Sequence, residues 1–421
     1  MRAQNSTKTV DNASQSVKLL VFRFVGKGGA AVQLSMNTRY AVIHASFWGA
    51  YGSLWAFIAL VLEYNGFASA QVGVVTSCAT LLSVFLSPAV SSFLDARPGL
   101  ENRHGAMALL TLAAALCLLV WLVPLPRPFV LGACFALIGA LLSSTPPFQN
   151  AMAMDANRCG IPVVYGFCRG VGSVSYAAAV LLLGFVLERH APTLLLPVFA
   201  ALTACGLIAM AGFRLPERPD EAADRPAEHR SIAAVLRSHP RFALTLLGCM
   251  FFFLTHTISN TYMNALVGKA GGTASAVGTS LAISAVLELP AMTLVSRLQK
   301  RFSPGFFLRF AAGAEVVKFL IFYLARSMPL IYLGQCMQFF QFAVYAPATV
   351  YYVAAALPER DQLKGQSLIY VAGSGLGGAL GNLLGGRLLD RSGIQAALLL
   401  GTVSAAASLL TFCLSTRKDS R

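Results

Sequence analysis

Long apolar stretches, separated by short polar ones, follow one another along almost the whole chain. Each is about twenty residues long, the length an α-helix needs to cross the hydrocarbon core of a bilayer. Divided at charges, prolines and turn residues, the chain has apolar stretches at 40–64, 70–94, 105–123, 128–153, 163–187, 193–213, 241–267, 273–296, 305–326, 328–356, 364–388 and 393–416. The pattern predicts an all-α membrane protein with twelve spans.

One polar stretch, "RLPERPDEAADRPAEHRSIAAVLRSHP" at 214–240, divides the spans into two sets of six. We expect a polar tail at 1–39, a six-helix bundle at 40–213, a loop at 214–240, a second six-helix bundle at 241–416 and a tail at 417–421. A short repeat, "GFVLERHA" at 184–191 and "GRLLDRSG" at 386–393, closes the fifth span of each half. Such internal similarity favours a duplicated architecture.

Composition excludes a soluble globular protein. The chain is 56% hydrophobic and 12% charged, against roughly 25% charged in an ordinary soluble domain. Most of its 32 Lys and Arg residues fall in the two tails and in the loops on the same side. The positive-inside rule therefore predicts a multi-pass cell-membrane protein with both termini in the cytoplasm. Because the net charge of +15 is explained by these loops, no nucleic-acid partner is expected.

Motifs for metal, disulfide or nucleotide chemistry are missing from the sequence. Its nine cysteines form no CxxC pair, so neither a disulfide framework nor a zinc site is predicted. No HExxH, paired-aspartate or Ser/His constellation lies in the spans, and no GxxxxGK[ST] motif occurs. We therefore expect no metal, no cofactor, no enzymatic activity and no ATP-driven pump.

Four full charges lie well inside the predicted spans, and each costs roughly 2.5–3.5 kcal/mol at a helix centre. They are Arg169, Glu288, Glu315 and Lys318. Glu315 and Lys318 are three residues apart on one helical face, so they either form a structural ion pair or serve transport. Glu288 has no opposite charge in its own span. It needs a partner elsewhere or a proton, because burial disfavours the charged carboxylate.

Polar and aromatic residues recur at helical spacing in three spans. They are His256, Asn260 and Asn264 in the seventh span, Gln338, Gln341 and Tyr345 in the tenth, and His44, Trp48, Tyr51 and Trp55 in the first. Each set lies on one helical face. Polar residues also join helices in membranes, but together with the charges these sets favour a water-accessible path. The aromatic set predicts either stacking on a solute or packing against lipid and core.

Prolines and glycines predict local irregularity in three spans. Pro146 and Pro147 should break the fourth span, and Pro290, two residues after Glu288, should bend or break the eighth. Breaks at membrane depth are tolerated where the freed backbone faces protein or a cavity. The eleventh span has a glycine at every fourth position from 373 to 385, which lets another helix approach closely.

The chain resembles a major facilitator superfamily transporter over roughly residues 36–416. More narrowly, it resembles the group that contains lactose permease, the nucleoside:proton symporters and the phenylpropionate permease. The stretch "PERDQLKGQSLIYVAGSGLGGALGNLLGGRLLDRSG" at 358–393 is similar to the loop and eleventh helix of that group, and "YGFCRGVGSVSY" at 165–176 is similar to its fifth helix. The resemblance implies two six-helix bundles that rock around a central site, and no enzymatic activity.

The resemblance also implies roles for single residues. Arg169 matches the substrate-binding arginine of lactose permease, and Tyr176 stands where that permease stacks a tryptophan on sugar. Glu288 matches the helix-eight glutamate that links the sugar and proton sites, and Lys318 falls near the helix-nine arginine. The helix-four acid and the helix-ten His and Glu of lactose permease are absent here. A galactoside is therefore not supported as the substrate, and the coupling proton would have to be carried by Glu288 or Glu315.

These observations predict a monomeric secondary transporter that carries a small organic solute together with a proton. A sugar or nucleoside is favoured. Uptake of an aromatic carboxylate, efflux of amphipathic compounds, and a membrane-embedded enzyme or assembly factor remain as alternatives. The residues expected to contact the solute are Arg169, Tyr176, Trp48, Tyr51, Asn260, Gln338 and Gln341, and those expected to couple the proton are Glu288, Glu315 and Lys318.

Overall fold

The computed structural model describes residues 35–97, 99–123, 128–216 and 232–417. Residues Met36–Arg421 form one compact unit, which contains helices and no strands within the described ranges. Residues 1–34 of the expected tail and 217–231 of the expected central loop lie outside these ranges. The last part of that loop forms a short helix, α10 (Ile232–Ser238).

The helices of the first half are α2 (Met36–Leu54), α3 (Ile58–Tyr64), α4 (Ser69–Asp95), α5 (Asn102–Leu122), α6 (Pro128–Ser144), α7 (Pro146–Arg158), α8 (Tyr165–Val186) and α9 (Leu195–Ala211), with 3₁₀ turns η1 (Trp55–Phe57) and η2 (Pro192–Leu194). After α10, those of the second half are α11 (Pro240–Thr261), α12 (Met263–Lys269), α13 (Ala274–Leu298), α14 (Pro304–Leu324), α15 (Met328–Cys336), α16 (Phe342–Ala356), α17 (Glu359–Tyr370), α18 (Gly378–Ser392) and α19 (Ile394–Ser415). A 3₁₀ turn, η3 (Met337–Phe339), joins α15 to α16, and a π-helical segment, η4 (Val371–Gly377), joins α17 to α18.

The predicted all-α membrane fold is confirmed. Eleven helical segments are long and apolar enough to cross a membrane. The one remaining predicted span is the ninth, which forms α14. It has 21 residues but carries three charges, Arg309, Glu315 and Lys318. It is the span whose charges need partners inside the protein.

In the described ranges, four spans are broken by a bend, a turn or a 3₁₀ segment: the first, fourth, seventh and tenth; the eleventh contains the π-helical segment η4. The fourth breaks where predicted, since α6 ends at Ser144 and α7 begins at Pro146. The other three interruptions lie at η1, at Tyr262 between α11 and α12, and at η3. The eighth span is not broken, because α13 continues through Pro290. Interruptions at every third span repeat across the two halves, as duplication predicts.

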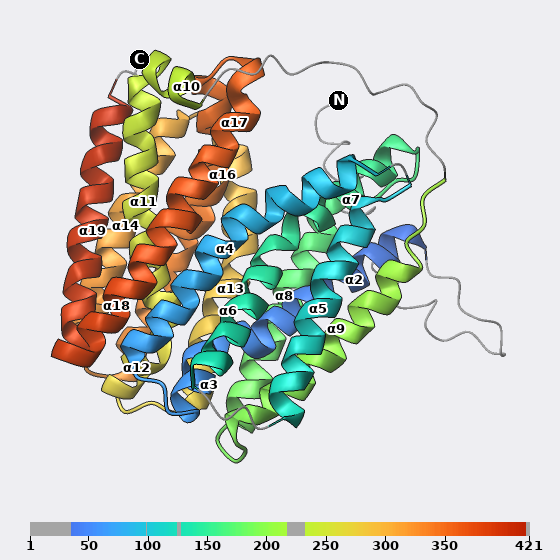
Figure 1. Ribbon diagram of the computed structural model, residues 1–421. Helices are drawn as coiled ribbons and strands as arrows, with labels where there is room; N and C mark the ends of the chain where they lie inside the picture. Colours follow the sequence, from blue (N-terminus) through green and yellow to red (C-terminus); the bar gives the residue numbers. More distant parts are fainter. Residues whose placement is uncertain (1–34, 98, 124–127, 217–231, 418–421) are drawn as a thin grey trace, which may run out of the picture. The chain divides into compact units, whose positions relative to one another are not determined.

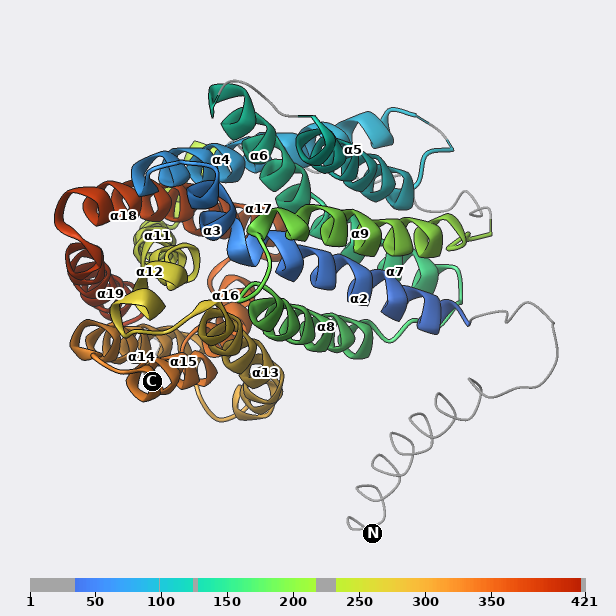
Figure 2. The ribbon, with the colours of Figure 1, turned by 90° about the horizontal axis from the view of Figure 1, so that it is seen from below.

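Each half packs on itself, and two helix pairs make most of the contact between the halves. In the first half α2 packs on α8 and α9, and α5 packs on α6 and α9; in the second, α11 and α14 pack on α19. The halves meet where α8 packs on α13 and where α4 packs on α18. The two helices of each pair are neighbours in Figure 2, and the two pairs lie on opposite sides of the molecule. We call this contact between the halves the joint. It is formed by the fifth and eighth spans (α8 and α13) and by the second and eleventh spans (α4 and α18).

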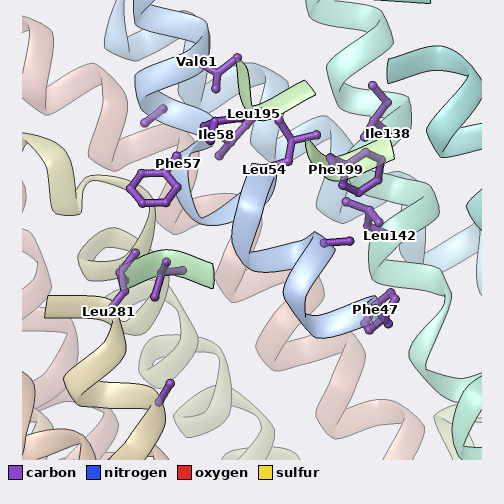
Figure 3. Close-up of a cluster of buried hydrophobic side chains, with 14 of the residues drawn as sticks. Phe47, Leu54, Phe57, Ile58, Val61, Ile138, Leu142, Leu195, Phe199 and Leu281 are labelled. Atoms are coloured by element: carbon purple, nitrogen blue, oxygen red, sulfur yellow. The ribbon is translucent and has the colours of Figure 1, made fainter. Parts of the chain in front are cut away.

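The buried side chains form two hydrophobic clusters. We call the end of the spans where α3 and α12 lie the distal end, and the end where α2 begins and α19 ends the terminus side (Figure 1). The first cluster contains the core of the first half and also reaches α13; Figure 3 shows Phe57 of η1 and Leu281 of α13 within it. The second cluster lies within the second half, around Phe242, Phe252 and Phe307. The halves thus share a hydrophobic core toward the distal end.

Candidate functional site

Arg169 is held in the first half by an aromatic ring and a hydroxyl. Its guanidinium carbon lies 4.0 Å from the centroid of the Trp48 ring, where cation–π attraction stabilises it. Its Nη1 donates a 2.9 Å hydrogen bond to Ser173 Oγ, one helical turn further along α8. Gly172 leaves room for the indole, because a Cβ there would lie 2.5 Å from Trp48 Cδ1. Most of the guanidinium N–H donors make no hydrogen bond within the described residues, so they remain for a further acceptor.

His44 extends this polar region along α2. It is 1% exposed, and its two ring nitrogens have no hydrogen-bond partner among the described residues. Its ring packs edge-on against Tyr40 and Tyr165, with centroids 4.7 and 6.1 Å away. The Tyr165 hydroxyl donates to Asn150 Oδ1 at 3.2 Å. Residues of α2, α7 and α8 therefore meet around one polar region.

An amide lies in the area where the lactose permease group has its helix-four acid. Gln149 of α7 is fully buried, and neither its amide nitrogen nor its amide oxygen has a partner in the described part of the chain. Its backbone carbonyl accepts a 2.8 Å hydrogen bond from the Tyr40 hydroxyl. Buried amides that lack partners are costly, so Gln149 is a polar group that a bound molecule or a change of conformation could satisfy.

In the second half, three side chains form a continuous hydrogen-bonded chain. Lys318 Nζ of α14 donates to Gln338 Oε1 at 2.9 Å, and Gln338 Nε2 donates to Glu288 Oε1 of α13 at 3.0 Å. Gln338 lies in η3, the turn that interrupts the tenth span. The glutamine amide thus connects a buried cation to a carboxylate that has no opposite charge in its own helix.

The direct ion pair considered for Glu315 and Lys318 is not formed. Both side chains are buried and interact electrostatically, but neither Glu315 carboxylate oxygen has a hydrogen-bond partner among the described residues. Lys318 instead bonds Gln338. Since an isolated buried carboxylate is costly, Glu315 is a second acid that can hold a proton.

A polar and aromatic cluster on α11 and α16 lies beside this chain. Asn260 Nδ2 is 3.0 Å from His256 Nε2 and donates to the His256 backbone carbonyl at 2.9 Å. The His256 ring stacks on Phe342, with centroids 4.4 Å apart and an interplanar angle of 10°. Gln341 Nε2 lies 3.5 Å from His256 Nδ1, and Lys318 acts electrostatically on the same ring. The cluster presents amides, an imidazole and an aromatic face in one place.

The halves bring several predicted site residues into one electrostatic environment. Glu288 interacts across the joint with Arg169 and with Tyr176 of α8, without a direct salt bridge to Arg169. Tyr51 interacts with Tyr176, and its ring lies 5.6 Å from the Trp48 ring. Residues from α2, α8 and α13 therefore lie around the same part of the joint.

Three members of the predicted stripes lie elsewhere. Asn264 is on α12, beyond the interruption at Tyr262, and donates to Glu63 Oε2 of the first half at 3.2 Å. A Cβ on Gly139 of α6 would collide with the Trp55 ring, so that tryptophan packs within the first half. Tyr345 is stacked on Phe252 at 3.9 Å. Helical spacing alone therefore did not predict what these three side chains contact, because interruptions and neighbouring helices also decide it.

Two contributors were not among the predicted site residues. Ser173 accepts from Arg169, and its position four residues after the arginine could have been read from the sequence. Phe342 stacks on His256, but it follows the turn at η3, so no periodic pattern marked it.

One cavity of about 540 Å³ opens beside α13 and η3. Its lining residues are Pro290, Thr293, Leu294, Arg297 and Phe339. It begins two residues beyond Glu288 and contains none of the predicted site residues. In the ranges that the structure describes, no three His, Cys, Asp or Glu residues are close enough together to hold a metal ion.

Comparison with known proteins agrees with this architecture. The chain is 26% identical over 400 residues to the maltose permease of Geobacillus stearothermophilus, covering 93% of this chain and 97% of the permease. It is 22% identical over 388 residues to the uncharacterized transporter YwbF of Bacillus subtilis (strain 168), covering 90% and 94%. Among solved structures, that of the nucleoside transporter NupG matches with a TM-score of 0.76 and 15% identity, over 92% of this chain and all of NupG.

A match to a family model decides the wider relationship. The model of the MFS_1 like family matches residues 37–400, which is most of the chain and includes both halves and all the site residues described above. The chain therefore belongs to this family of the major facilitator superfamily and is a multi-pass membrane transporter rather than an enzyme.

Proposed function

We propose that this transporter is a proton-coupled symporter of a small polar organic solute, a sugar or a nucleoside, and that Glu288 carries the coupling proton. The main support is the place of Glu288. It is hydrogen-bonded through Gln338 to Lys318 in its own half and interacts electrostatically with Arg169 of the other half. A carboxylate in that position changes the attraction between the halves when it gains or loses a proton.

Alternating access would use this carboxylate in two steps. The solute binds at the joint, between Arg169 and Tyr176 on one side and Asn260 and Gln341 on the other. Protonation of Glu288 then removes its negative charge from a poorly hydrated site, which lowers the cost of closing the loaded carrier. Glu315 holds the proton in a second position when Lys318 remains bonded to Gln338.

The polar groups of the site suit a molecule rich in hydroxyls. Arg169 offers donors only, the Glu288 carboxylate offers acceptors, and the amides of Asn260 and Gln341 offer both. Hydroxyls also donate and accept, and the faces of sugars and bases pack on aromatic rings such as that of Trp48. The name of the related maltose permease and that of the structurally similar nucleoside transporter point the same way.

An aromatic carboxylate is the second candidate. It is favoured by one observation, the Arg169 guanidinium lying on the Trp48 ring with most of its donors unused in the described residues. A planar acid could bond the guanidinium through its carboxylate and stack on the indole. A thermal-shift screen of the purified protein against sugars, nucleosides and aromatic acids separates the two candidates, because a ligand stabilises the folded carrier by mass action.

We also propose the orientation and state of the protein. The basic loops and tails favour a cytoplasmic position for both termini, so the distal end would face outside. Symport with protons that move inward would then import the solute. A monomer contains both halves of the site and is the proposed working unit.

Replacing Glu288 by glutamine tests the coupling. In proteoliposomes whose outside is more acidic than the inside, wild-type protein should accumulate the solute. Glu288→Gln should lose this accumulation but retain solute exchange at equal concentrations, because glutamine keeps the shape of the side chain and cannot release a proton. Glu101→Gln is the matched control, since Glu101 pairs with Arg103 at 2.9 Å, away from the site. Gradient-driven accumulation by Glu288→Gln at the wild-type level would refute the role of Glu288.

A further inference from the structure

The short repeat that closes the fifth and eleventh spans places an acid at the distal end of each half. "GFVLERHA" and "GRLLDRSG" share a glycine, a leucine three residues later, and then an acid followed by arginine. In the first copy these are Gly184 and Glu188, at the end of α8; in the second they are Gly386 and Asp390, in α18. Because α8 and α18 are the helices that meet the opposite half, both acids lie at the joint.

Each acid reaches the start of a helix in the opposite half. Glu188 Oε1 accepts from Thr273 Oγ1 at 2.7 Å and from Ser275 Oγ at 2.5 Å, at the first turn of α13. Asp390 accepts from the backbone nitrogens of Ser69, at 3.0 Å, and Ala70, at 2.7 Å, at the first turn of α4. Helix N-termini have unpaired N–H groups and favour negative charge. The second and eighth spans are thus capped from the other half of the molecule.

The glycine one turn before each acid makes this reach possible. A Cβ at Gly184 would lie 2.9 Å from the Ala274 carbonyl oxygen, and one at Gly386 would collide with the Ser69 carbonyl oxygen. Ala274 and Ser69 are the first residues of the helices that the acids cap. Glycine and acid therefore act on the same helix start: the glycine permits close approach, and the acid binds it.

We propose that the pairs Gly184–Glu188 and Gly386–Asp390 are two symmetry-related latches that hold the halves together at the distal end and must release for that end to open during transport. This rests on the proposed alternating-access function. The shared hydrophobic cluster also joins the halves toward the distal end, through Phe57 and Leu281. A third contact, from Asn264 to Glu63, lies beside the Asp390 latch, since Glu63 also accepts from Ser69 Oγ at 3.4 Å.

The latches are unequal in how they can be broken. Glu188 binds two side-chain hydroxyls, whereas Asp390 binds two backbone N–H groups, which only a proline substitution would remove. Glu188→Ala and Asp390→Ala each delete one latch. Both acids lie at exposed positions, where water can satisfy the helix starts, so these variants should still fold. Glu188→Gln and Asp390→Asn keep an acceptor and remove only the charge.

Distance measurements between the halves test the proposal without needing the solute. Spin labels carried by non-natural amino acids at His190 and Gln395, both exposed at the distal end, leave the nine native cysteines untouched. Each alanine variant should raise the ratio of long to short distances about threefold, because a charged cap at a surface contributes only a modest free energy. The double variant should raise it about tenfold, because the free-energy contributions of separate sites are nearly additive. Glu101→Ala, whose acid pairs within one half, should leave the ratio unchanged.

The outcomes separate this proposal from the transport mechanism. If the double alanine variant keeps the wild-type distance distribution while eluting as a folded monodisperse protein, the latches do not hold the distal end and the proposal is wrong. If the alanine variants shift the distance distribution but Glu188→Gln and Asp390→Asn do not, the latches act through hydrogen bonds rather than charge, and the proposal stands. A protein that shows the expected distance shift but fails to couple uptake to protons would overturn the proposed function and leave the latches in place.

Discussion

Lys318 and Glu315 show how one helix can carry two charges through a membrane without pairing them directly. Lys318 is stabilised by Gln338, whereas both Glu315 oxygens lack a partner among the described residues. The two side chains still interact electrostatically at a separation of three residues. The lysine therefore stabilises both a hydrogen-bonded neighbour and an acid that has no other nearby support.

A double-mutant cycle at these positions should be far from additive. Lys318→Met leaves Gln338 Oε1 without its donor and Glu315 without its cation, so we expect a loss of stability on the order of 3 kcal/mol. Glu315→Gln removes the unpartnered carboxylate and should cost much less. Adding it to Lys318→Met should restore part of the loss, with a coupling of roughly 0.5–3 kcal/mol. Thermal unfolding of the four proteins measures the cycle, and additive shifts would contradict this account.

The stabilisation that the Glu188 carboxylate gives at the distal end should depend on pH. Hydrogen bonds from Ser275 and Thr273 lower the pKa of its carboxyl below the ordinary 4.5, and the nearby Arg189 contributes in the same direction. A lowered pKa in the folded protein means that the stabilisation is complete above the unfolded value and is lost as the pH falls through the folded value. The Tm difference between wild type and Glu188→Gln should thus stay constant from pH 7 to 5 and shrink only below. A difference that has vanished by pH 5 would show that the hydrogen bonds do not hold the charged form.

At the scale of helices, interrupted and continuous spans contribute different residues to the proposed site. Trp48 and Tyr51 lie on the first span, Asn260 on the seventh, and Gln338 and Gln341 on the tenth, and all three spans are interrupted. An interrupted helix at membrane depth exposes backbone groups that need protein or water, which suits a solute site. The charged members of the proposed site, Arg169, Glu288 and Lys318, lie instead on the continuous helices α8, α13 and α14.

Sequence pattern accounts for the membrane spans, and its failures have physical causes. Apolar length was enough to find the spans but not the short helix α10, which lies in the predicted polar loop, and the cost of burying charge is what made Arg169, Glu288 and Lys318 candidates. Periodicity assumes an unbroken helix, so it misplaced Asn264, which lies beyond a break that has no proline. Contacts between halves, such as Asp390 with the start of α4, depend on how two surfaces meet, and no local pattern encodes that.

Two glycines provide a matched test of helix packing at the joint. A Cβ at Gly278 of α13 would collide with the Val180 carbonyl oxygen of α8, whereas one at Gly313 of α14 would meet nothing within 4 Å. Gly278→Ala should therefore push α8 from α13 and destabilise the protein by about 1–3 kcal/mol. Gly313→Ala should be neutral or stabilising by up to about 1 kcal/mol, because alanine favours helix. Equal Tm values for the two variants would mean that the helices can separate without cost.

On the scale of the whole molecule, the joint has different tasks along its length. Toward the distal end, buried side chains and the caps of α4 and α13 connect the halves. Further along the same joint, Arg169 and Glu288 interact across it without a direct bond. A joint that is closed at the distal end and carries charges beyond it suits a carrier that opens one end at a time, with the distal contacts released when the distal end opens.

Charge balance at the centre predicts how membrane potential should act on uptake. Arg169 and Lys318 are cancelled by Glu288 and Glu315, so one added proton gives the carrier loaded with an uncharged solute a single positive charge. Carrying that charge inward gains roughly 2.3 kcal/mol per 100 mV of negative-inside potential, or about 50-fold in accumulation. A valinomycin-imposed potassium potential at equal pH on both sides should therefore drive uptake of a sugar or nucleoside in wild-type proteoliposomes but not in Glu288→Gln. An aromatic carboxylate would cancel the charge of its proton and show no such drive. If uptake of an uncharged solute does not depend on the membrane potential, coupling to a single proton is ruled out.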